Sequence, residues 1–166
     1  AQNGFANLAE PKLSDTPTVD HHNQHYRKIE MIIDILPELY WLVLTITMTA
    51  LMWVPQIIQS IFKVGLKTAF LYPDEAATHY ASWAKRAKLA HSNAVQNLVI
   101  FAPLTLLVLA LGLSSDMTAY IAIIYFFART FHYIMHIIAI PLTRTICFLI
   151  GVACQIVMAA TIFNAL

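Results

Sequence analysis

Charged residues are scarce in this sequence. Only 11% of the 166 residues are Asp, Glu, Lys or Arg, whereas a soluble domain carries roughly 25%. This shortage argues against a soluble globular enzyme and against a disordered protein. The net charge of +1 is too small to hold a phosphate backbone, so the composition also argues against a nucleic-acid binder.

Cysteine is scarce as well. The two cysteines, Cys147 and Cys154, lie in one C-terminal apolar run. On a helix this spacing separates them by roughly 10 Å along the axis, which is too far for a disulfide. We interpret both as buried thiols. The first 28 residues are polar, so we expect no cleavable signal peptide.

Apolar residues, by contrast, make up 59% of the chain and cluster in four long runs: residues 39–62, 93–113, 117–140 and 145–166. The first run is ~36 Å long as a helix, enough to cross a ~30 Å hydrocarbon core, and Pro55 should kink it. Only GLSSD and PLTR separate the later runs. The sequence therefore predicts an all-α integral membrane protein, an up-down bundle of four transmembrane helices.

The chain divides into two parts. Residues 1–38 form a polar, acidic N-terminal tail whose last residues, 30–38, are an amphipathic lead-in, and residues 39–166 form the membrane domain. The tail contains a small cluster of histidines, His21, His22 and His25. This cluster fits a solvated polar tail better than a metal site.

The distribution of Lys and Arg predicts the orientation in the membrane. Arg144 lies in the third link, whereas the second link holds only Asp116. The first link holds five basic residues: Lys63, Lys67, Lys85, Arg86 and Lys88. We therefore expect the first and third links on the cytoplasmic side and both termini on the opposite side.

One face of the third run is polar. Its members share a helical face at spacings i, i+3, i+4 and i+7: Arg129, His132, Tyr133 and His136. Ionisable groups inside a span are costly and tend to be functional. Arg129 is always charged, so it must face a protein interior or a wet cavity. The stripe is either a binding site or a set of hydrogen bonds that braces the bundle.

The beginning of the second run is polar too, with Arg86, His91, Asn93, Gln96 and Asn97. Arg86 and His91 fit a helix that crosses the headgroup layer, whereas Gln96 and Asn97 lie at the hydrocarbon edge. In the predicted orientation, however, this polar set meets the polar end of the third run and Arg144 at the cytoplasmic end of the bundle. Such an electropositive pocket would suit a small anion with several carboxylates. An arginine there could also hold a substrate thiol as the reactive thiolate.

A metal or haem protein is a further alternative. His132 and His136, at i and i+4, could share one metal, and haem would more naturally pair His91 or His132 with a second helix. The neighbouring Arg129 and Arg144 disfavour a dication, so we predict no metal site.

Two segments carry a family resemblance: RAKLAHSNAVQNLVIFAPL, residues 86–104, and ARTFHYIMHIIAIPLTRT, residues 128–145. They resemble the MAPEG family, membrane-associated proteins in eicosanoid and glutathione metabolism. The likeness covers about residues 40–166 and is closest to the small bacterial members. It implies a homotrimer in a bacterial inner membrane, with glutathione as co-substrate bound between subunits at the cytoplasmic ends of the helices.

The resemblance also implies roles for individual residues. Asn93 matches the asparagine that helps to hold glutathione, and Arg129 and His132 match an R-x2-H motif that lines the same site. Arg144 matches an arginine beside the glutathione sulfur, which makes it the catalytic candidate. The full set of predicted glutathione-binding residues is Arg86, Asn93, Gln96, Arg129, His132, Tyr133 and His136.

Three positions depart from the family pattern. Gln96 replaces a glutamate that holds glutathione, and Leu89 replaces an arginine of the animal members. His136 stands where a tyrosine is usual, with Tyr133 nearby. The thiolate-stabilising position is therefore kept, whereas positions that grip the peptide are changed.

Two functions follow from these observations. The first is a glutathione-dependent transferase or peroxidase for a lipophilic electrophile, which would arrive laterally from the bilayer. The second is a non-catalytic accessory or structural subunit of a larger membrane complex, in which the pocket binds a lipid headgroup or cross-braces the helices. The three departures favour the second function.

Overall fold

The computed structural model describes residues 37–166, and every described element is helical. The predictions for the N-terminal tail, including the histidine cluster and all but the end of the amphipathic lead-in, lie outside the described residues.

The first apolar run forms two consecutive helices, α2 (Pro37–Leu51) and α3 (Val54–Leu71). The break falls at Met52 and Trp53, directly before Pro55. Proline has no N–H to donate to the carbonyl one turn back, and its ring clashes with that turn. The kink expected at Pro55 is thus confirmed, as a full interruption of the helix.

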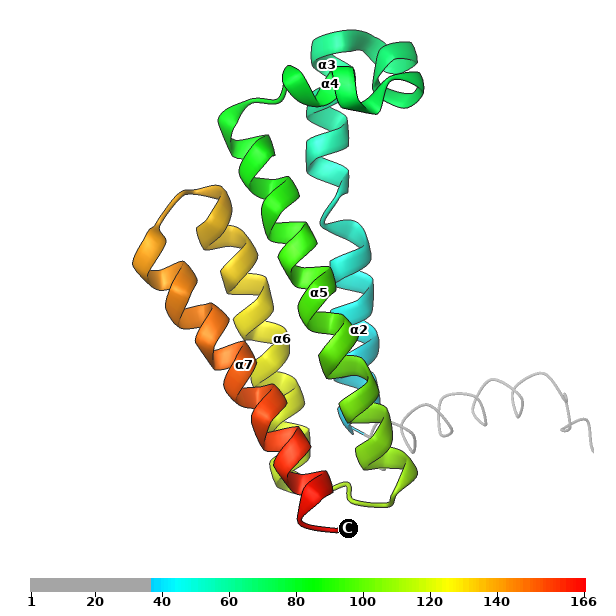
Figure 1. Ribbon diagram of the computed structural model, residues 1–166, viewed down its shortest axis with the longest axis vertical. Coiled ribbons are helices and arrows are strands. Elements are labelled where there is room, and N and C mark those ends of the chain that lie inside the picture. Colours follow the sequence, from blue (N-terminus) through cyan, green and yellow to red (C-terminus); the bar gives the residue numbers. More distant parts are fainter. Residues whose placement is uncertain (1–36) are drawn as a thin grey trace, which may run out of the picture.

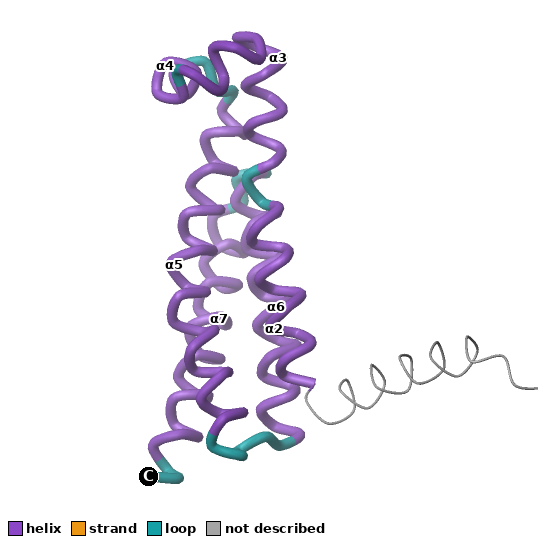
Figure 2. The backbone as a smooth tube through the Cα atoms, turned by 90° about the vertical axis from the view of Figure 1, so that its right-hand side faces the viewer, coloured by secondary structure: helices purple, strands orange, loops and turns teal. Residues whose placement is uncertain are grey.

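A second change of direction occurs inside α3 at Gly65, whose φ of 82° and ψ of 161° are not helical. This backbone conformation is accessible to glycine because it has no Cβ. The rest of α3 and the short helix α4 (Pro73–Thr78) lie across the end of the bundle (Figures 1 and 2).

Three long helices complete the bundle: α5 (Ser82–Ala110), α6 (Asp116–Ile137) and α7 (Pro141–Phe163). Ser115 caps α6 in a reciprocal capping box with Thr118, which stabilises the first turn by satisfying two free N–H groups. Pro141, which the sequence placed in the link between the third and fourth runs, begins α7, where its missing N–H costs nothing.

The described helices support an integral membrane protein. Three segments are long and apolar enough to cross a bilayer: Pro37–Leu71, Ser82–Ala110 and Pro141–Phe163. Helix α6, with its polar stripe, is not among them. That α6 crosses the membrane as a fourth span stays a prediction.

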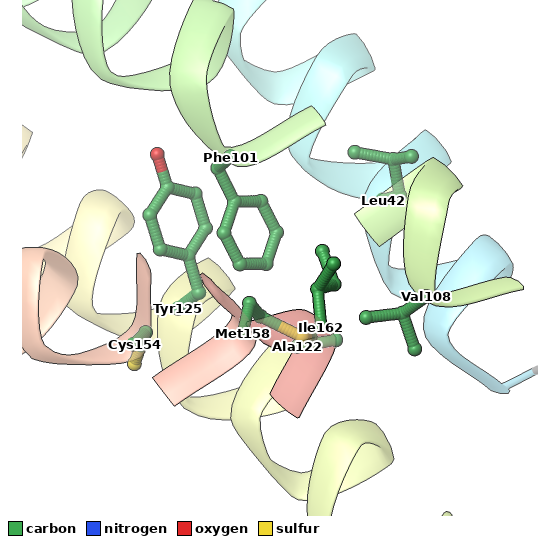
Figure 3. Close-up of a cluster of buried hydrophobic side chains, with 8 residues drawn as sticks. All are labelled: Leu42, Phe101, Val108, Ala122, Tyr125, Cys154, Met158 and Ile162. Carbon is green, nitrogen blue, oxygen red and sulfur yellow. The ribbon is translucent and has the colours of Figure 1, made fainter. Parts of the chain in front are cut away.

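The helices pack around a core in the half of the bundle that contains the α5–α6 link. Phe101 of α5 stacks on Tyr125 of α6, with ring centroids 3.6 Å apart, and the remaining side chains come from all four long helices (Figure 3): Leu42, Val108, Ala122, Cys154, Met158 and Ile162. Both cysteines are free and buried, which confirms their interpretation as buried thiols.

The chain runs up and down, so alternate links share an end. The α3–α4 segment, the beginning of α5 and the α6–α7 link lie at one end, and the α5–α6 link and the C-terminus lie at the other (Figure 1). The basic first and third links therefore share one end, as the predicted orientation requires. We call this end the basic end.

Candidate functional site

A cavity of about 380 Å³ opens between α5, α6 and α7. Its lining combines polar and apolar side chains: Leu89, Asn93, His132, His136, Arg144, Thr145 and Phe148. Among the described residues that line it, none is acidic. Since Leu89 and Thr145 are exposed, the cavity is open to the exterior of the chain.

Helical periodicity brings these residues together. Leu89 and Asn93 are four residues apart on α5, and His132 and His136 are four apart on α6, so each pair shares one face. The PLTR segment was expected to be a link, but it forms the first turn of α7. Arg144 is therefore fixed on a helix rather than on a flexible loop.

Arg129 lies behind the cavity and is only 2% exposed. Its Nη2 donates a hydrogen bond of 2.6 Å to Oδ1 of Asn93. Its Nε and Nη1 have no partner among the described residues. A buried guanidinium with unpaired N–H groups is costly, so the hydrogen bond to Asn93 matters for the stability of this part of the bundle.

Gly151 of α7 makes room for this arginine. A Cβ at that position would lie 3.3 Å from Cδ of Arg129, closer than ordinary van der Waals contact. The same Cβ would lie 3.8 Å from a ring carbon of Tyr125. The close approach of α7 to α6 thus depends on the absence of a side chain here.

The two histidines face the cavity with their rings 5.8 Å apart. The Nδ1 atoms of His132 and His136 are buried and have no hydrogen-bond partner within residues 37–166. In that same part of the chain, no three His, Cys, Asp or Glu side chains form a metal-binding group. Both histidines line the cavity, so a ligand held there would lie against their rings.

Three of the predicted binding residues lie elsewhere. Arg86 donates from Nε to the carbonyl of Ile137 at 2.8 Å and so holds the C-terminal end of α6. Gln96 is exposed and does not line the cavity. Tyr133 donates to the carbonyl of Met52 at 2.8 Å, on another side of α6. In this chain, these three contribute no side chain to the lining.

Sequence reasoning also missed two lining residues, Thr145 and Phe148. Phe148 could have been found, because it follows Arg144 by four residues and shares its helical face. Thr145 carries no comparable signal in the sequence.

A second cavity, of about 430 Å³, lies where the first apolar run is broken. It is bounded by α2, α3 and α6, and its residues are mostly apolar: Leu44, Thr47, Met48, Leu51, Met52, Pro55, Phe126, Thr130 and Tyr133. Polar ligands have little to bind there, so the two cavities differ in the chemistry that they suit.

The sequence was compared with known protein families, curated proteins and solved structures. The model of the MAPEG family matches residues 38–164, which is well over half of the chain and nearly all of the residues that the structure describes. No curated protein and no solved structure gives a significant match. The family match includes all of the helices that form both cavities, and the chain belongs to the MAPEG family.

Proposed function

We propose that this protein is a membrane-bound glutathione-dependent transferase or peroxidase that acts on lipophilic electrophiles. The MAPEG family includes such enzymes as well as non-catalytic members. In this proposal the protein is a homotrimer in a bacterial inner membrane, α6 is the fourth transmembrane helix, and the basic end faces the cytoplasm. Glutathione is the thiol co-substrate.

The observation that carries the proposal is the charge of the cavity between α5, α6 and α7. Arg144 lines it and Arg129 lies directly behind it, with no acidic residue among the described side chains of the lining. Glutathione carries two carboxylates and a thiol, and guanidinium groups bind carboxylates through charge-assisted hydrogen bonds. Asn93, His132 and His136 add polar contacts for the peptide.

Arg144 would act on the thiol. Its positive charge stabilises the thiolate, which is the nucleophilic form, and the thiol proton leaves to solvent. In a transferase, a sulfur lone pair forms the new C–S bond, and the leaving group departs with the electrons of the bond that breaks. In a peroxidase, two glutathione molecules are oxidised to the disulfide while a hydroperoxide is reduced to an alcohol and water.

The apolar part of the lining would receive the electrophile. Leu89 and Phe148 contribute hydrocarbon surface to the same cavity that Arg144 lines. A lipophilic molecule dissolved in the bilayer could therefore approach laterally and meet the thiolate without crossing water. Asn93 and Arg129 would orient the peptide from the other side, which lowers the entropic part of the barrier.

Calorimetry of glutathione binding to the detergent-purified protein tests this proposal. We expect micromolar-to-millimolar binding that the Arg144→Ala variant loses, together with its conjugation or peroxidase activity. Lys88→Ala is the matched control, because Lys88 is an exposed basic residue of α5 outside the cavity. Unchanged binding and activity in Arg144→Ala would sink the assignment.

A second function is favoured by one feature of the cavity. Leu89 contributes an apolar wall where animal family members carry an arginine. Gln96 is exposed and does not line the cavity, which is all that this alternative requires of it. In this alternative the protein is an accessory or structural subunit, and the cavity binds a lipid headgroup or braces the bundle. Co-purification with a stable larger complex would support it, whereas an isolated trimer that binds glutathione would contradict it.

A further inference from the structure

The segment that crosses the basic end has an unusual outer surface. After Gly65 the chain leaves the direction of the bundle, and the remainder of α3 and all of α4 run across its end (Figures 1 and 2). The buried side chains of this segment are the small Ala69 and Ala76. We call residues 62–78, which include the three residues before the bend at Gly65, the transverse segment.

The transverse segment has large apolar side chains that are exposed. Phe70 is 64% exposed, and the others are comparable or more exposed: Phe62, Leu66, Leu71 and Tyr72. Trp83, at the beginning of α5, is also exposed. A group of exposed large apolar side chains fits a membrane or protein contact, and aromatic residues are enriched at membrane–water interfaces.

The basic residues of the first link lie on the transverse segment and at the beginning of α5. Between residues 62 and 88 there are five basic and two acidic side chains, a net charge of +3. Lys63 and Lys67 lie on the transverse segment itself and are exposed, and Lys85 and Lys88 lie exposed near the beginning of α5. The acidic pair, Asp74 and Glu75, lies on α4 and so balances the two lysines of the transverse segment. The net positive charge comes from the beginning of α5.

The length of the bundle places this segment at the membrane surface. The chain from Pro37 to Gly65 rises about 42 Å at ~1.5 Å per residue, and a bilayer with its headgroups is about 40–45 Å thick. If α2 begins at one headgroup layer, the transverse segment lies in the other. Apolar side chains beside lysines fit that layer, because lysines bind anionic headgroups while apolar groups enter the acyl boundary.

We propose that the transverse segment, together with Lys85 and Lys88 at the beginning of α5, is an in-plane anchor that binds anionic phospholipid headgroups of the leaflet at the basic end. The lysines attract the headgroups, and Phe70 and its apolar neighbours fix the depth. The anchor would hold the first link in the plane of the membrane. This proposal is independent of glutathione binding, because none of its residues lines the cavity.

Depth-dependent quenching of a single tryptophan tests the anchor. The reporter is Phe70→Trp in a background in which Trp41, Trp53 and Trp83 are replaced by Phe. Leu149→Trp in the same background is the matched control, because Leu149 is 58% exposed on α7 within the bundle. Each protein is reconstituted in bilayers of phosphatidylcholine and phosphatidylglycerol, one of which carries brominated acyl chains.

We expect the Phe70→Trp reporter to be quenched more by bromines near the headgroups than by deep bromines. We also expect brominated phosphatidylglycerol to quench it about twofold more strongly than brominated phosphatidylcholine, with no such preference for the Leu149→Trp reporter. Lys63→Gln with Lys67→Gln should lower the preference, and Lys63→Arg with Lys67→Arg should keep it. Raising salt to about 1 M should also lower it, since the screening length falls to ~3 Å.

Three outcomes would overturn the proposal. A reporter that no bromine quenches, but that a soluble quencher reaches, would place the segment outside the membrane. A reporter that neither kind of quencher reaches would show that a second copy or another protein covers the surface. Equal quenching by the two lipids would refute the preference for anionic headgroups. Circular dichroism of each variant excludes misfolding as the cause.

Discussion

The hydrogen bond between Asn93 and Arg129 gives a sharp test of the site, because one partner is a buried charge. Asn93→Ala removes the only acceptor that the described residues give to the Arg129 side chain, at 2.6 Å from Nη2. The guanidinium stays buried, since it is 2% exposed. The variant should therefore lose stability, and the loss should depend on the presence of the arginine.

Two known ranges bound the coupling energy between Asn93 and Arg129. Hydrogen bonds to charged groups contribute about 1.5–3 kcal/mol in soluble proteins, whereas polar pairs within membranes average about 0.6 kcal/mol and reach about 1.7. Because this pair is charged and buried, we expect a coupling energy near 1.5 kcal/mol. For a chain of this length, that corresponds to a difference of roughly 3–6 °C in Tm.

A double-mutant cycle measures the coupling. Thermal unfolding in detergent, followed by circular dichroism, is compared for the wild type, Asn93→Ala, Arg129→Met and the double variant, all without glutathione. Asn93→Ala should lower Tm in the wild-type background and have little effect beside Arg129→Met. Equal effects of Asn93→Ala in both backgrounds, within about 0.5 kcal/mol, would refute the reasoning.

Two further predictions concern other buried positions. Glu38 is fully buried and accepts hydrogen bonds from Ser114, at 2.8 Å, and from Thr118, so Glu38→Ala should cost about 2 kcal/mol of stability; an unchanged Tm would show that α2 does not depend on this contact. Gly151→Leu should displace Arg129, cost about 1–3 kcal/mol and weaken glutathione binding, whereas Gly151→Ala should have a smaller effect. If Gly151→Leu binds glutathione as the wild type does, the arginine does not contribute to the site.

Much of the fold follows from local rules that the sequence obeys. A long apolar run predicts a transmembrane helix whatever its neighbours are, because the bilayer forces every backbone N–H and C=O group to form its hydrogen bond within its own segment. The break before Pro55 follows from the missing N–H of one residue. The bend at Gly65 was not predicted, because a glycine permits that conformation without requiring it.

Part of the site follows from the same rules. His132 and His136 share a face because the helix repeats every 3.6 residues, and Asn93 and Arg144 join them because α5 and α7 meet α6 near the basic end. The beginning of α7 at Pro141 was missed, since proline both ends one helix and begins the next. For this reason we expected Arg144 in a link, whereas it lies on α7.

The sequence by itself determined that the chain is helical and membrane-embedded, and that Arg129, His132, Tyr133 and His136 project from one stretch of one helix. Only the tertiary structure decided which of these side chains meet in a cavity. Tyr133 adjoins His132 in the sequence, yet it bonds to Met52 on another side of α6. Side chains on one helical face can contact two neighbouring helices. The periodicity of the sequence gives the angle of each side chain around the helix axis, but it does not say which neighbouring helix that side chain contacts.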